Sequence, residues 1–73
     1  MVHRTTFINK IRDLGYTFKG QQKRTYLWRK QGGTHRIFVP MCDLLEEVWV
    51  VSTLLHAGQS KDEIEAFIRS AKS

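Results

Sequence analysis

The chain of 73 residues is long enough for one small domain, and its content of 41% hydrophobic and 26% charged residues is that of a globular protein. Its single cysteine, Cys42, excludes an internal disulfide, and the sequence has no apolar run of about 18 residues that could cross a bilayer. We therefore expect a single domain over residues 1–73, located in the cytoplasm and without a membrane partner.

Charge is distributed unevenly along the chain. The net charge is +5, but residues 1–36 carry nine Lys and Arg against one Asp, a net charge of +8, whereas residues 37–73 have a net charge of −3. In one compact domain, such halves give one side that attracts polyanions. A basic surface that is only solvated is the simpler alternative. The pI of about 9.8 and the aromatic residues among the basic ones favour nucleic-acid binding.

A first helix is predicted over residues 5–14. Thr5 or Thr6 is the expected N-cap, because a hydroxyl there accepts a hydrogen bond from a backbone N–H. Apolar residues within 7–14 recur at the spacing of one helical face, and Gly15 is the expected C-terminal stop.

Three strands are predicted next, over residues 16–18, 24–30 and 35–39. The second is rich in strand-forming residues, and Pro40 ends the third. Residues 31–34 read Gln-Gly-Gly-Thr, and paired glycines favour a tight hairpin turn because they accept positive φ angles.

The last two predicted helices each begin with a capping box, Asp43 with Glu46 and Ser60 with Glu63. The β-branched stretch 48–51 also fits a strand, but the apolar pattern around it extends past strand length, which favours a helix. The predicted fold is therefore α+β in the order α-β-β-β-α-α, with a three-stranded antiparallel sheet and helices on one face.

The predicted hairpin carries the strongest functional signal. Strand side chains alternate, so Tyr26 and Trp28 share one face, and Leu27 and Arg29 share the other. Helices on one side cover only one face, and the open face would present apolar or aromatic groups flanked by cations, as in RNA-binding surfaces. Trp28 fits a place in the core equally well. The predicted RNA-binding residues are Lys19, Lys23, Arg24, Thr25, Tyr26, Trp28, Arg29, Lys30 and Arg36.

Histidines offer few other candidates. His35 beside Arg36 has the chemistry of a general acid or base for a ribose phosphate, and it fits a half-buried strand residue as well. His3 and His56 are scattered and Cys42 has no nearby cysteine, so the sequence predicts no metal site and no cofactor.

Trp49 lies off the main apolar face of the second predicted helix and leaves that helix hydrophobic nearly all round. A helix of this kind is buried on several sides or forms an interface. A homodimer through the helix that contains Trp49 is therefore one expected assembly.

The order of elements and several short motifs resemble the HicA family of small bacterial toxins. The motifs are residues 14–16 (Leu-Gly-Tyr), residues 39–40 (Val-Pro) and residues 54–58 (Leu-Leu-His-Ala-Gly), at spacings close to those of the family. The resemblance covers nearly the whole chain. It implies a fold like that of the double-stranded-RNA-binding domain, ribonuclease activity on messenger RNA, and an antitoxin-like protein partner of the HicB type.

The family's catalytic histidine stands at the start of the middle strand. In the alignment that keeps every element in place, Thr25 or Tyr26 occupies that position, which implies RNA binding with weak or no nuclease activity. A second alignment places His35 there, requires a strand over 48–51, and implies an active mRNA interferase that His35→Ala would inactivate. A protein-interaction module that docks an acidic partner on the same basic surface is the third hypothesis.

Overall fold

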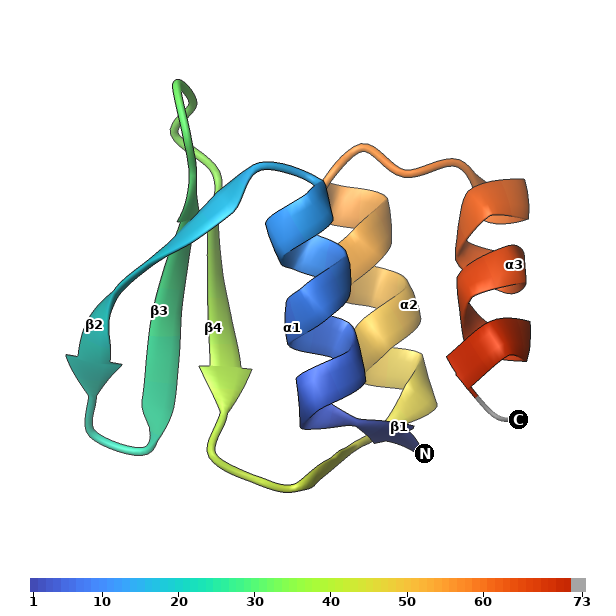
Figure 1. Ribbon diagram of the computed structural model, residues 1–73, viewed down its shortest axis with the longest axis horizontal. Helices are drawn as coiled ribbons and strands as arrows, with labels where there is room; N and C mark the ends of the chain where they lie inside the picture. Colours follow the sequence, from blue (N-terminus) through green and yellow to red (C-terminus); the bar gives the residue numbers. More distant parts are fainter. Residues whose placement is uncertain (72–73) are drawn as a thin grey trace.

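The computed structural model describes residues 1–71 and confirms the predicted order of the helices and the three main strands (Figure 1). The structure also contains two short strands that the sequence analysis did not predict. These strands pair with each other, and Val2 lies opposite Leu45. In chain order the elements are β1 (Val2–His3), α1 (Arg4–Asp13), β2 (Tyr16–Gln22), β3 (Thr25–Lys30), β4 (Arg36–Pro40), β5 (Leu44–Leu45), α2 (Glu47–His56) and α3 (Lys61–Ala71).

The main sheet has the strand order β2-β3-β4, and both pairs are antiparallel. The predicted hairpin turn over residues 31–34 joins β3 to β4. β2 runs to Gln22, beyond the predicted end at Phe18, because its second half continues to pair with β3. A bulge between Phe18 and Gly20 shifts the register there and leaves Lys19 outside the pairing.

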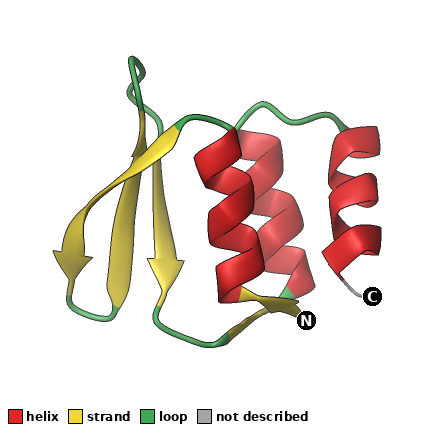
Figure 2. Cartoon of the chain, in the orientation of Figure 1, coloured by secondary structure: helices red, strands yellow, loops and turns green. Residues whose placement is uncertain are grey.

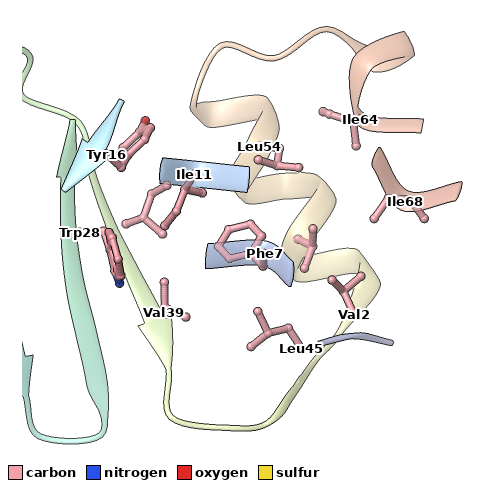
Figure 3. Close-up of a cluster of buried hydrophobic side chains, with 12 residues drawn as sticks. Val2, Phe7, Ile11, Tyr16, Trp28, Val39, Leu45, Leu54, Ile64 and Ile68 are labelled. Atoms are coloured by element: carbon pink, nitrogen blue, oxygen red, sulfur yellow. The ribbon is translucent and has the colours of Figure 1, made fainter. Parts of the chain in front are cut away.

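The three helices lie on one side of the main sheet (Figures 1 and 2). Buried side chains of the sheet and of the helices form one hydrophobic core. Figure 3 shows Phe7 and Ile11 of α1 between Val39 of β4 and Leu54 of α2. Among residues 1–71, the core is formed by twelve buried side chains: Val2, Phe7, Ile11, Tyr16, Trp28, Ile37, Val39, Leu45, Val50, Leu54, Ile64 and Ile68.

Strand pairing, rather than a side-chain cap, fixes the start of α1. The helix begins at Arg4 after His3, whose side chain makes no capping hydrogen bond. The prediction of Thr5 or Thr6 as the N-cap was therefore wrong. The β1–β5 pair holds the preceding residues extended, and the Arg4 N–H donates to the backbone oxygen of Asp43 at 2.8 Å.

The start of α2 also differs from its prediction. Asp43 and Glu46 do not form a capping box, because Leu44–Leu45 form β5 and the helix begins only at Glu47. Residues 48–51 lie within α2, so the helical prediction for this stretch is confirmed.

The capping box at the start of α3 is confirmed. The Ser60 N–H donates to Oε1 of Glu63 at 3.1 Å, and the Glu63 N–H donates to Oγ of Ser60 at 3.2 Å. The hydrogen bond that the Ser60 backbone N–H donates to the Glu63 carboxylate, followed by the interaction of that carboxylate with the Ser60 side chain, holds the pKa of Glu63 below its usual value.

We expect Glu63→Gln to be less stable than the parent protein at pH 7 and equally stable at an acidic pH below the folded-state pKa of Glu63. Because the pKa of Glu63 is lower in the folded state, its contribution is present above the unfolded pKa and is lost as pH falls through the folded pKa. Urea unfolding at the two pH values measures the difference. Glu65→Gln removes the same charge from α3 outside the capping box, and an equal pH dependence for this control would contradict the expectation.

Candidate nucleic-acid interface

The charges of the chain are separated in space as well as in sequence. No Asp or Glu occurs between Asp13 and Asp43, so every charged side chain of the main sheet and its turns is basic. The sheet and α3 lie at opposite ends of the molecule (Figure 1), and α2 and α3 hold most of the acidic residues. An approaching polyanion is therefore steered to the sheet end. The basic residues there are Lys19, Lys23, Arg24, Arg29, Lys30 and Arg36.

One face of the main sheet turns away from the helices and is called the open face, consisting of Thr17, Leu27, Arg29, Arg36 and Phe38. The neighbours of these residues in β3 and β4, Trp28, Ile37 and Val39, point the other way into the core. Phe38 is 45% exposed, so an aromatic ring lies on the open face beside two arginines.

Arg29 and Arg36 stand directly opposite each other on β3 and β4. Like charges opposite one another weaken a strand pair. Within residues 1–71 neither guanidinium forms an ion pair with a carboxylate. Arg29 Nε donates only to the backbone oxygen of Gly33, at 3.3 Å. A bound anion between the two side chains would remove this repulsion.

A cationic groove of about 540 Å³ lies beside the arginine pair, between β2 and the β3–β4 turn. Lys19, which the bulge in β2 leaves out of the strand pairing, lines this groove together with residues of the β3–β4 turn. The groove is lined by Thr17, Phe18, Lys19, Arg29, Lys30, Gln31, Gly32, Gly33 and Thr34. Three predicted RNA-binding cations therefore share one concave surface.

Two predicted RNA-binding rings lie on the covered face. Trp28 is 5% exposed, so its alternative place in the core is confirmed, and its ring offers little surface to a base. Tyr26 is half-buried and packs against the core. The guanidinium of Arg12 lies 5.7 Å from the Trp28 ring centroid, and that of Arg4 lies 5.5 Å from the Tyr26 centroid. Cations of α1 thus cover both rings.

The remaining predicted residues lie at the β2–β3 turn. Lys23 and Arg24 are exposed there, at the end of the sheet opposite the β3–β4 turn (Figure 1). Thr25 is half-buried, and its hydroxyl donates to the backbone oxygen of Gln22 at 3.0 Å. The structure does not bring these residues together with the cationic groove.

His35 directly precedes β4 and is half-buried. Its Nδ1 lies 2.6 Å from the hydroxyl oxygen of Tyr16. Burial raises the pKa of Tyr16, so the hydroxyl keeps its proton at neutral pH and can donate to Nδ1. In the neutral imidazole Nε2 then carries the proton. The alignment that makes His35 catalytic needs a strand over residues 48–51, which are helical.

A second histidine that sequence reasoning left out of the site lies near His35. His56 ends α2 and, with His35, lines a groove of about 230 Å³ at the β4 edge of the sheet. This histidine groove is lined by His35, Arg36, Ile37, Phe38, Trp49, Thr53 and His56. The alternation of side chains along the strand could have indicated Phe38 as a residue of the site, whereas nothing in the sequence around His56 points to a role there.

Trp49 packs partly inward against the core and leaves only part of its side chain at the surface. It is half-buried, and its ring meets Phe7 edge-on with centroids 5.2 Å apart. The large exposed apolar side chains of α2 are Val48 and Leu55, and Leu55 lines a groove of about 550 Å³ between α2 and α3. Self-association through α2 stays a prediction, and its contacts would come from Val48 and Leu55.

Among residues 1–71, no three His, Cys, Asp or Glu side chains are placed to hold a metal ion, and no helix is long and apolar enough to cross a membrane. No protein-family model, curated protein or solved structure matches this chain. Fold and surface together define a small α+β domain with three helices, a two-stranded sheet and a three-stranded antiparallel sheet that has a cationic open face.

Proposed function

We propose that this protein is a small RNA-binding domain of the HicA-like, dsRBD-like type with weak or no nuclease activity. The observation that carries the proposal is the pair of Arg29 and Arg36 opposite each other beside the exposed ring of Phe38. Phosphates neutralise such a pair, and an unpaired base stacks on such a ring.

The geometry of the site favours RNA over a general polyanion. A polyanion that is bound by its charge alone gains nothing from an exposed aromatic ring, whereas the faces of unstacked RNA bases stack on such a ring. Phe38 and Leu27 lie opposite each other in the register, which gives an apolar step directly next to the arginine pair. An RNA strand with unstacked bases fits a surface on which this apolar pair lies next to the arginine pair.

The side chains at the position of the family's histidine support weak or absent cleavage. The Thr25 hydroxyl is engaged in the β2–β3 turn, and Tyr26 lies half-buried under Arg4. As residue types, threonine and tyrosine lack the ability of an imidazole to change charge near neutral pH. RNA binding does not depend on them, because phosphate contacts need only the cations.

Titration of fluorescently labelled single-stranded and hairpin RNAs with the protein at 50 and 200 mM salt tests the proposal. We expect binding that weakens about tenfold or more at the higher salt, since several phosphates are contacted. Intact RNA after prolonged incubation is the expected companion result. No binding at the lower salt would overturn the proposal, and binding of only an acidic protein partner would favour the interaction-module alternative.

A further inference from the structure

The histidine groove is continuous with the open face. Arg36 and Phe38 line the groove and also stand on the open face, so one arginine and one ring belong to both surfaces. β4 is the edge strand of the main sheet. A strand of RNA that crosses the arginine pair and leaves over β4 therefore enters this groove next.

The polar groups of the groove match a phosphate rather than a cation. His35 and Arg36 come from the β4 side, and Thr53 and His56 come from α2. Together they offer imidazole, guanidinium and hydroxyl donors, and none of the described residues that line the groove is acidic. Tyr16 of β2 is a further titratable group at the groove, because its hydroxyl is hydrogen-bonded to His35.

Resting on the proposed function, we propose that the histidine groove is a phosphate subsite whose RNA affinity is controlled by protonation of His35 and His56. An imidazole changes charge near neutral pH, whereas the arginines and lysines stay charged. Each protonated ring would add one charge-assisted hydrogen bond to the phosphate.

The contact with Tyr16 is compatible with both charge states of His35. In the neutral ring the Tyr16 hydroxyl donates to Nδ1, and in the charged ring Nδ1–H donates to the hydroxyl oxygen after the hydroxyl rotates. The Nε2 proton is present in both states. Protonation therefore adds charge in the groove without removing the hydrogen bond that positions the ring.

The test measures RNA affinity between pH 8 and pH 5.5 at fixed salt for the parent protein and for His35→Gln, His56→Gln and the double variant. We expect the parent to gain about tenfold in affinity for each histidine as pH falls, the usual effect of a charge-assisted hydrogen bond. Each single variant should keep about half of the logarithmic gain, and the double variant should keep none. His3→Gln, an exposed histidine of β1 outside the groove, is the matched control and should behave like the parent.

The outcomes separate this inference from the proposed function. Binding that is salt-sensitive but independent of pH, or a pH dependence that survives in the double variant, overturns the phosphate subsite and leaves RNA binding intact. Loss of the pH dependence in His3→Gln also overturns it. Failure of every variant and the parent to bind at any pH overturns the proposed function itself. The far-ultraviolet circular dichroism spectrum of His35→Gln is expected to match that of the parent, which checks that the fold survives loss of the Tyr16 contact.

Discussion

Replacing Arg29 and Arg36 together by glutamine is expected to weaken RNA binding about a hundredfold. Each guanidinium contributes about 1.5 kcal/mol through a charge-assisted hydrogen bond to phosphate, which is roughly tenfold in affinity. The slope of binding against salt concentration should also fall by about one for each arginine removed. Titrations of labelled RNA at several salt concentrations measure both quantities.

The same double variant is expected to be at least as stable as the parent protein. The two arginines are directly opposite each other without a neutralising carboxylate among the described residues, so their removal relieves a repulsion.

For the RNA titrations, Arg69→Gln is the matched control, because it removes an exposed arginine from α3 at the acidic end. An equal loss of affinity in this control would mean that net charge, rather than the arginine pair, governs binding.

Local signals predicted their parts of the fold well. The Ser60–Glu63 capping box spans four residues, and the glycine turn joins adjacent strands, so neighbouring sequence decides both. The caps predicted at Thr5 and Asp43 were overridden by pairing of β1 with β5, two segments about forty residues apart. Such pairing leaves no periodic signal, because each strand is only two residues long.

The candidate site was predictable in composition but not in orientation. Alternation along β3 correctly separated Tyr26 and Trp28 from Leu27 and Arg29. Which of these two faces the helices cover depends on packing of α1 and α2 across the sheet, and both faces carry apolar side chains. The sequence alone therefore could not assign Trp28 to the core.

Substitutions of Trp28 and of Phe38 are expected to act on different properties, the first on folding stability and the second on RNA binding. Trp28→Ala is expected to lower the free energy of unfolding by about 3–5 kcal/mol, because a buried aromatic side chain is lost and a cavity remains. That loss is a large part of the stability of a domain this size, which is about 4–10 kcal/mol. Urea unfolding monitored by circular dichroism measures it. Trp28→Phe should be milder, since it also removes an indole N–H that is buried with no hydrogen-bond partner among the described residues.

Leucine substitutions at the two positions test their roles in binding, because leucine keeps apolar bulk and removes the ring. Trp28→Leu should lose stability and keep its RNA affinity within about twofold when folded, since the buried indole reaches no base. Phe38→Leu should stay as stable as the parent and lose about 1–3 kcal/mol of binding, the usual contribution of one stacked base. A reversal of this pattern, with affinity lost at Trp28 and kept at Phe38, would place the RNA on the helix side of the sheet and contradict the assignment of the open face.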